Sequence, residues 1–335
     1  MTNLAQHPWT TLVAEPSQLA ECPFWHPQEQ TLYWVDIAGC QIKRANVYMG
    51  TVESWPMLVD GKPTEPGCMA PARSGGLVIA LRDRIVRART WGGALETLHL
   101  FAHDPSTTRA NDGKCDSAGR FWVGTMYEPR DANKAELLCL DARNNSNNPN
   151  PKPSPNAAST TQAAITVERK AGDATVANGL AWSPDARTLY WADTPQHAVF
   201  AWDYDLASNA MTRHRVFKQF PPKPAGWLPF APHNGGYLGR PDGASVDVLG
   251  NYWVAMYEGQ RVLQIAASGE ILRDIPAPVL CTTMVCFGGE DLQTLYLTSA
   301  RHGRSAADLL VQPELGCVFS MRVDVPGLPV QYFED

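Results

Sequence analysis

Four polar residues about one third of the way along the chain precede an apolar segment, in a pattern that could support chemistry. They are Arg109, Asn111, Asp112 and Lys114. Residues 121–123, which follow, are aromatic or β-branched and predict a buried strand after a turn at 116–119. A purely structural segment would place apolar residues ahead of such a strand. This departure from the local pattern indicates a functional site.

Oxygen-bearing side chains elsewhere in the chain could bind a metal ion. Glu21 and Asp242 offer carboxylates and Asn178 offers an amide oxygen, the donors that Ca²⁺, Mg²⁺ and Mn²⁺ prefer. Three such ligands would leave positions open for water and substrate. The guanidinium of Arg109 and the amide of Asn111 suit a polyhydroxylated or anionic ligand. These residue types favour a metal site beside a polar substrate pocket.

Each of these residues also has a structural interpretation. Asn178 and Asp242 precede glycines and could simply form turns, while Glu21 could be a solvated loop carboxylate. Arg109 and Asn111 could belong to a structural turn that carries a surface charge. Their positions in an internal repeat help to choose between the two interpretations.

Strand-like runs recur along the chain, each with one aromatic or apolar residue at its centre. The central residues are Trp34, Val78, Trp122, Trp191, Trp253 and Leu297. Their spacings are 44, 44, 69, 62 and 44 residues, and turn-forming residues precede each run. A period of about 40 to 50 residues built from short strands is typical of a β-propeller.

The expected fold is therefore all-β. Residues 1–335 are predicted to form one domain, a six-bladed β-propeller with four-stranded antiparallel blades around a central metal site. Ring closure is expected to pair a strand near 9–13 with residues 317–323. Two insertions explain the long intervals. Residues 143–161 are polar and Pro-rich and predict a flexible loop, whereas residues 220–237 are also aromatic and predict an ordered insertion or lid near the site.

The repeat brings the candidate residues to matching positions, because the innermost strands of a propeller line its channel. Thirteen residues ahead of the central residues stand Glu21, Glu65, Arg109, Asn178, Arg240 and Met284. Eleven residues ahead stand Pro23, Gly67, Asn111, Leu180, Asp242 and Cys286. Asp242 stands two residues after Arg240. If that segment is an extended strand, the Asp242 side chain points to the same face of the strand as residues thirteen ahead of the central residues. Glu128 could reach this level or be an exposed loop acid, and Asp36 and Asp193 are expected to bind turn amides.

Composition excludes several classes of partner. The 335 residues are 44% hydrophobic and 19% charged, with a formal net charge of −6, so binding to nucleic acid or an anionic membrane is not expected. No stretch is long and apolar enough to cross a bilayer. Eight scattered cysteines and the lack of a secretion signal favour reduced thiols in the cytoplasm. We expect a monomer or a weak homo-oligomer.

The chain resembles the SMP-30/gluconolactonase/regucalcin family of six-bladed propellers over nearly its whole length. The resemblance is carried by Glu21-Cys-Pro-Phe-Trp25, Arg109-x-Asn-Asp-Gly-Lys114, Asn178-Gly-Leu180, Arg240-Pro-Asp-Gly243 and Cys286-Phe-Gly-Gly289. It implies that Glu21, Asn178 and Asp242 bind one divalent cation (Ca²⁺, Mg²⁺, Mn²⁺ or Zn²⁺). It also implies that Arg109, Asn111 and Glu128 contact a sugar lactone. Cys22 departs from the Gly or Ser that is frequent in the family.

The implied activity is hydrolysis of an aldonolactone to the aldonic acid. The cation would polarise the lactone carbonyl, and Asp242, kept ionised by the cation, would act as general base. Two alternatives stay open. One is an organophosphate or aryl-ester hydrolase of the same propeller type, although Arg109 and Asn111 favour hydroxyl groups. The other is a non-catalytic calcium-binding propeller.

Overall fold

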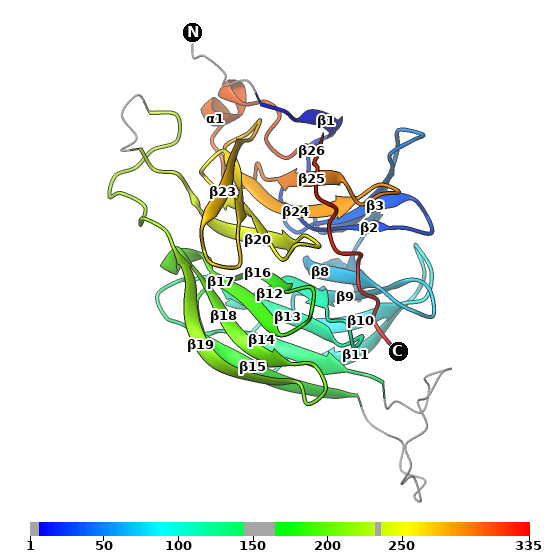
Figure 1. Cartoon of the computed structure of the whole chain (residues 1–335). Coiled ribbons are helices and arrows are strands. Elements are labelled where there is room, and N and C mark those ends of the chain that lie inside the picture. The colour runs from blue at the N-terminus through cyan, green and yellow to red at the C-terminus, as the bar shows by residue number, and fades with distance from the viewer. Residues whose placement is uncertain (1–6, 144–164, 232–235) are drawn as a thin grey trace, which may run out of the picture.

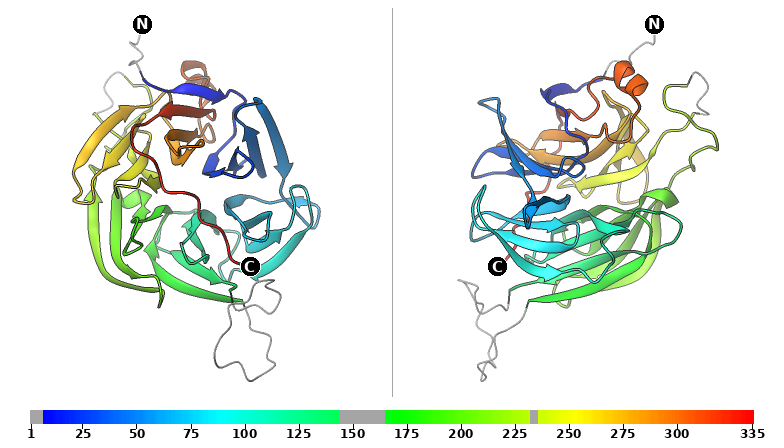
Figure 2. Two further views of the ribbon diagram at one scale, coloured as in Figure 1. Left: turned by 45° about the vertical axis from the view of Figure 1, so that its right-hand side comes forward. Right: turned by 180° about the vertical axis from the view of Figure 1, so that it is seen from behind.

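The computed structural model describes residues 7–143, 165–231 and 236–335. Most of these residues lie in short antiparallel strands, which form six four-stranded sheets and one two-stranded hairpin. The four-stranded sheets are arranged as blades around a common axis (Figures 1 and 2). The predicted fold class, a six-bladed β-propeller with four-stranded antiparallel blades, is confirmed.

The first three blades use strands that follow one another in the sequence. Blade one contains β2 (Ala20–His26), β3 (Thr31–Asp36), β4 (Gln41–Asn46) and β5 (Thr51–Pro56). Blade two contains β8 (Pro66–Pro71), β9 (Leu77–Leu81), β10 (Arg84–Ala88) and β11 (Leu95–Leu100). Blade three contains β12 (Thr108–Cys115), β13 (Phe121–Tyr127), β14 (Ala135–Asp141) and β15 (Thr166–Ala174).

The last three blades continue the ring, and the sixth also uses the first strand of the chain. Blade four contains β16 (Ala177–Trp182), β17 (Thr188–Asp193), β18 (Ala198–Asp205) and β19 (Ala210–Gln219). Blade five contains β20 (Arg240–Val246), β21 (Tyr252–Tyr257), β22 (Arg261–Ile265) and β23 (Ile271–Pro276). Blade six contains β24 (Thr282–Gly288), β25 (Thr294–Ser299), β26 (Val318–Arg322) and β1 (Thr10–Val13).

In the described ranges, few elements lie outside the blades. They are the hairpin of β6 (Leu58–Val59) and β7 (Lys62–Pro63), the 3-10 turn η1 (Thr194–Gln196) and the helix α1 (Ala306–Val311). Ser305 caps α1 by accepting a hydrogen bond from the backbone N–H of Asp308, which satisfies one of the free donors of the first turn.

The first strand of each blade lies on the inside of the ring. These inner strands, β2, β8, β12, β16, β20 and β24, each contact the next one around the circle. Because each inner strand forms a hairpin with the second strand, it begins on the face where the second strand ends. We call this the upper face, and the opposite face, where the hairpin turns lie, the lower face.

The two ends of the chain close the ring together. β1 is antiparallel to β26, with Thr10 opposite Ser320 and Thr11 opposite Phe319. Figure 1 shows β1, in blue, beside β26. This pairing confirms the predicted closure and covers an edge strand that would otherwise expose free backbone groups.

Every inner strand changes register against its neighbour at a corresponding place. The shifts fall within residues 21–24, 66–68, 110–113, 178–181, 241–244 and 282–285. Such bulges redirect side chains away from regular alternation. Asp242 lies within one of them, so the regular extended segment on which its shared face depended is absent there. At Gly179, φ is +60° and an added Cβ would lie 2.3 Å from the Tyr252 hydroxyl, so this bulge requires glycine.

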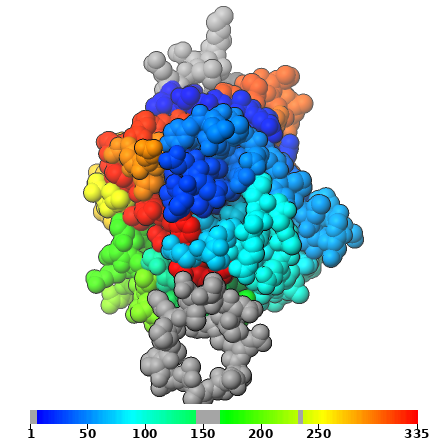
Figure 3. All heavy atoms as spheres, turned by 90° about the vertical axis from the view of Figure 1, so that its right-hand side faces the viewer, coloured from blue at the N-terminus to red at the C-terminus, as the bar shows by residue number. Residues whose placement is uncertain are grey.

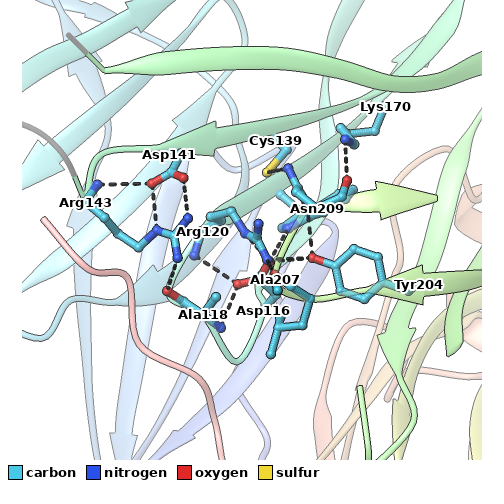
Figure 4. A network of polar contacts seen from close by, with 12 residues as sticks. Asp116, Ala118, Arg120, Cys139, Asp141, Arg143, Lys170, Tyr204, Ala207 and Asn209 are labelled. Atoms are coloured by element: carbon cyan, nitrogen blue, oxygen red, sulfur yellow. Dashed lines mark hydrogen bonds and ion pairs between the residues drawn. The ribbon is translucent and has the colours of Figure 1, made fainter. Parts of the chain in front are cut away.

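Aspartates in the lower turns hold the strands of a blade together, and one of them also joins two blades. The carboxylate of Asp116 accepts hydrogen bonds from Arg120 Nε at 2.7 Å, Trp122 Nε1 at 2.9 Å and Tyr204 Oη at 2.9 Å. Tyr204 lies on β18, so this turn joins blade three to blade four (Figure 4). Asp247 repeats the arrangement in blade five, where it accepts from the ring nitrogen of that blade's central tryptophan.

The segment after β26 crosses the lower face of the ring (Figure 2, left). Gly327 forms an isolated antiparallel β-bridge with Asp247 of blade five. The fully buried Phe333 forms an isolated parallel β-bridge with Ala72 of blade two. Beyond it, Arg87 Nε donates to the Asp335 carboxylate at 2.8 Å. Figure 3 shows part of this segment, in red, between atoms of the first two blades. The tail therefore links blades that are distant along the chain.

Of the two predicted insertions, the first lies almost wholly outside the described residues. The second is described except for residues 232–235. Phe220, Trp227 and Tyr237 are buried in it, and the rings of Trp227 and Tyr237 meet edge to face at 5.5 Å. Trp227 and Tyr237 belong to the same apolar cluster as Trp253 of blade five. A role as a lid stays a prediction.

Candidate functional site

Five of the predicted site residues begin or lie within inner strands near the upper face. Glu21 lies on β2, Arg109 and Asn111 on β12, Asn178 on β16 and Asp242 on β20. Between 4% and 8% of the surface of each is exposed. Charged and amide groups buried this deeply need polar partners. The partners present show how the site is organised.

A chain of hydrogen bonds runs across three blades. Arg109 Nη1 donates to Asn111 Oδ1 at 2.7 Å, and Asn111 Nδ2 donates to Asn178 Oδ1 at 2.9 Å. Asn178 Nδ2 in turn donates to Thr194 Oγ1 at 2.8 Å, and the Thr194 hydroxyl donates to the Pro241 carbonyl at 2.9 Å. Because the hydroxyl proton is committed to that carbonyl, the nitrogen of Asn178 faces Thr194 and its oxygen faces Asn111.

Three buried carboxylates influence one another at the same level. Burial, together with the charges of Asp242 and Asp112, raises the pKa of Glu21 well above its usual value. Burial also raises the pKa of Asp242, although the positive charge of Arg240 opposes this effect. One oxygen of Asp112 accepts from the backbone N–H of Leu180, and its Oδ1 has no hydrogen-bond partner among the described residues.

This arrangement fits a divalent cation by the chemistry of its donors. Buried like charges raise each other's pKa, and a cation between them would remove that penalty. The described residues contain no group of three His, Cys, Asp or Glu side chains suited to a metal. The predicted set is compatible with this finding, because its third donor is the amide oxygen of Asn178, which has a second lone pair available.

Glu128 lies on the upper face just after β13 but is engaged by arginines. Its carboxylate is 3.0 Å from Arg82 and 3.7 Å from Arg109. Arg82 also forms an ion pair with Glu65 at 2.6 Å. On this side of the site, the two positive charges of the arginines therefore balance the two negative charges of Glu65 and Glu128. Contact of Glu128 with a substrate stays a prediction.

Two aspartates expected to be structural are confirmed as such. Asp36 accepts hydrogen bonds from the backbone N–H groups of Leu19 and Gly39. Asp193 accepts from the backbone N–H groups of Thr175 and Val176 at 3.1 and 3.0 Å. Each aspartate fixes the chain that leads into an inner strand, so it positions the site without belonging to it.

A second group of charges, to which the sequence alone assigned no site role, lies on the upper face. Lys223, Arg240 and Arg304 all bind the carboxylate of Glu258. A signal for Glu258 exists in the sequence, because Met-Tyr at the end of the second strand is followed by Glu both at 126–128 and at 256–258. Lys223 and Arg304 lie in loops with irregular spacing, where the repeat offers no register.

A separate cavity of about 180 Å³ opens toward the lower face, where Pro329 of the tail lines it. Lys114 and Cys22 also line this cavity, and Lys114 Nζ donates to the carbonyl of Ala244. Cys22 stands next to Glu21 with φ of +47°. These two side chains therefore lie between the lower cavity and the level of the carboxylates.

Comparison with known proteins adds to this geometry. The profile of the SMP-30/gluconolactonase/LRE-like region matches residues 19–301. The chain belongs to this family. Among its curated relatives, 6-deoxy-6-sulfogluconolactonase of Pseudomonas putida is 38% identical over 316 residues, which cover 94% of this chain and 95% of that protein. Regucalcin of Danio rerio is 32% identical over 323 residues, which cover 95% of each.

Solved structures share the fold. A calcium-binding protein, regucalcin, from Agrobacterium tumefaciens matches with a TM-score of 0.80 and 21% identity, covering 98% of both chains. A gluconolactonase from Xanthomonas campestris matches with a TM-score of 0.65 and 21% identity, covering 96% of this chain and 91% of that one. None of the helices in the described ranges has the length and apolar character needed to span a bilayer.

Proposed function

We propose that this chain hydrolyses a sugar lactone to the corresponding aldonic acid, with one divalent cation held by Glu21, Asn178 and Asp242. The buried carboxylates of Glu21 and Asp242, beside the oriented amide of Asn178, carry the proposal. Family membership supports it, as does the Pseudomonas putida relative, which is named for a gluconolactone derivative. The identity of the cation is left to the experiment.

Each side chain has a chemical task in this proposal. Asp242 accepts a proton from the water that attacks the lactone carbonyl carbon. Arg109 donates hydrogen bonds to the hydroxyl groups of the sugar and orients it. Both Nδ2 hydrogens of Asn111 are bound to Ala177 and Asn178, so its Oδ1 accepts a hydrogen bond from a sugar hydroxyl. Asn178 and Glu21 complete the oxygen donors for the cation. When bound, a divalent cation supplies Lewis-acid stabilisation of negative charge on the carbonyl oxygen.

The experiment is hydrolysis of a panel of aldonolactones in a pH-indicator assay. The protein is assayed after chelation and again after addition of Ca²⁺, Mg²⁺, Mn²⁺ or Zn²⁺. Hydrolysis that disappears on chelation and returns with a cation is the expected result. Full activity in chelator, or activity only toward aryl esters or organophosphates included in the panel, would contradict the proposal.

A further inference from the structure

Three cations on the upper face share one carboxylate. Lys223 Nζ and Arg240 Nη1 each lie 2.8 Å from Glu258 Oε2, and Arg304 Nη2 lies 2.9 Å from Glu258 Oε1. The Glu258 side chain is 3% exposed, whereas those of Lys223, Arg240 and Arg304 are 32%, 16% and 13% exposed. The carboxylate is therefore enclosed while the cations reach solvent.

The charge in this group is unbalanced. No other Asp or Glu in the described ranges forms an ion pair with these three cations, so the ion pairs leave an excess of two positive charges. The Asp242 carboxylate, on which the charge of Arg240 also acts, offsets only part of this excess. The opposite side of the site differs, because Arg82 and Arg109 face Glu65 and Glu128. A local positive excess is also unusual in a chain of net charge −6. Unneutralised cations in a partly buried place attract an anion.

Hydrogen-bond donors without partners give a second, independent indication. Nε of Arg304 and Nε1 of Trp227 are buried, and neither has a hydrogen-bond partner among the described residues. Trp227 belongs to the same neighbourhood, since Lys223 Nζ lies 4.3 Å from its ring centre. Both groups can only donate, and leaving such a donor unpaired costs free energy. A ligand that offers only acceptor oxygens would complement them.

The group adjoins the predicted catalytic residue. Arg240 is two residues before Asp242 on β20, and its charge acts on the Asp242 carboxylate. Glu258 directly follows β21, and Arg304 lies in the loop after β25, so both stand on the upper face. A substrate whose lactone lies at Asp242 would therefore extend toward these cations.

We propose that Lys223, Arg240 and Arg304 form a subsite for an anionic group carried by the substrate at the end remote from the lactone carbonyl. Glu258 positions the three cations. The substrate class is then an aldonolactone with a terminal sulfonate, phosphate or carboxylate, all of which present acceptor oxygens to arginine and lysine. This inference rests on the proposed lactonase function and specifies its substrate.

The test compares gluconolactone with its analogues that carry a 6-sulfonate, a 6-phosphate or a terminal carboxylate. The wild-type protein is expected to prefer one of the anionic lactones, and the preference should shrink as salt is added. In Arg304→Gln and Lys223→Gln, kcat/KM for that lactone should fall roughly 10- to 100-fold further than kcat/KM for gluconolactone, because each removes a hydrogen bond to a charged group. The three analogues distinguish the anions.

Arg44→Gln is the matched control. Arg44 is also a partly buried arginine, 24% exposed and paired with Glu53 at 2.9 Å, but it lies on β4 in the outer half of blade one. Its replacement should leave the ratio of the two kcat/KM values unchanged. Equal losses on charged and neutral lactones in Arg304→Gln would show a structural role and overturn the subsite.

Two failures are distinguishable. Hydrolysis of gluconolactone without any preference for charged analogues would reject the anion subsite and leave the lactonase proposal standing. Absence of hydrolysis with every lactone and cation would reject the lactonase proposal itself. Calorimetric titration with 6-sulfogluconate gives a reading that does not depend on turnover, and wild-type protein should bind it more tightly than Arg304→Gln.

Discussion

The carboxylate of Asp242 combines a functional benefit with a cost in stability. It is buried near Glu21 and Asp112, so its charged form is disfavoured without a cation. Asp242→Asn should lower kcat by about 10²- to 10⁴-fold, as expected for loss of a general base. In metal-free protein the same change should raise the melting temperature, by an amount on the order of a few °C.

Thermal melts and lactone assays on the same preparations check this prediction. Added cation should stabilise wild-type protein and have a smaller effect on Asp242→Asn. Glu270→Gln, at an exposed position just after a turn, is the control and should change neither activity nor stability. Retention of full activity in Asp242→Asn would remove Asp242 from the mechanism.

The raised pKa values of Glu21 and Asp242 also predict a pH dependence. Without metal, the folded protein holds protons that the unfolded chain has already released. Its stability should therefore fall as pH rises from the ordinary carboxyl pKa through the raised values. Metal binding should displace these protons, so affinity should increase with pH. Calorimetry in buffers of different ionisation enthalpy measures the protons released, and no release would contradict the prediction.

The repeat indicated some site residues and could not indicate others. Glu21, Arg109 and Asn178 occupy one register position of the inner strands, so counting from the central residues was enough to bring them together. Lys223 and Arg304 come from loops of irregular length. Their proximity depends on the folded course of those loops, for which the sequence contains no periodic signal.

At the scale of elements, one aspartate in a turn holds neighbouring blades. Asp116→Ala would remove the partner of the buried Arg120 guanidinium and of two further donors, on Trp122 and Tyr204. Breaking a buried ion pair on one side typically costs about 3–5 kcal/mol. Chemical denaturation of wild type and variant measures this loss.

Asp185→Ala is the matched control for that experiment. Asp185 occupies the corresponding turn of blade four, but it is exposed, and among the described residues its side chain accepts only from Ser183 and the backbone N–H of Arg187. Its removal should cost about 1 kcal/mol or less. Similar losses in the two variants would mean that the link between blades contributes little beyond the turn itself.

The strands themselves were largely predictable, because the aromatic and β-branched centres recur with the same spacing in three intervals. The bulges were not. The sequences of inner strands such as β12 and β20 predict ordinary extended segments. Only the pairing with the second strand of the blade shows the change of register. A bulge arises from the fit between two strands, so one strand read alone does not reveal it.

At the scale of the whole molecule, ring closure between β1 and β26 offers a place for a covalent link. Thr10 and Ser320 are paired residues, and paired Cα atoms in antiparallel strands lie about 4.5–5.5 Å apart, within reach of a disulfide. Oxidised Thr10→Cys/Ser320→Cys protein should gain up to about 4 kcal/mol, because the link closes a very long loop.

Melting the oxidised and reduced forms of this double variant isolates the effect of the link. Each single cysteine variant serves as a control for the substitution alone. An oxidised form that melts no higher than the reduced one would mean that the closing strands are not where unfolding begins.

The same closure bears on synthesis of the protein in the cell. Of the described strands, a ribosome makes β1 first and β26 last, so β1 stays unpaired while five blades are translated. Throughout that time the nascent chain carries an unpaired strand, and incomplete blades expose edges that can pair with other chains. Chaperone demand should therefore be greatest just before residues 318–322 emerge.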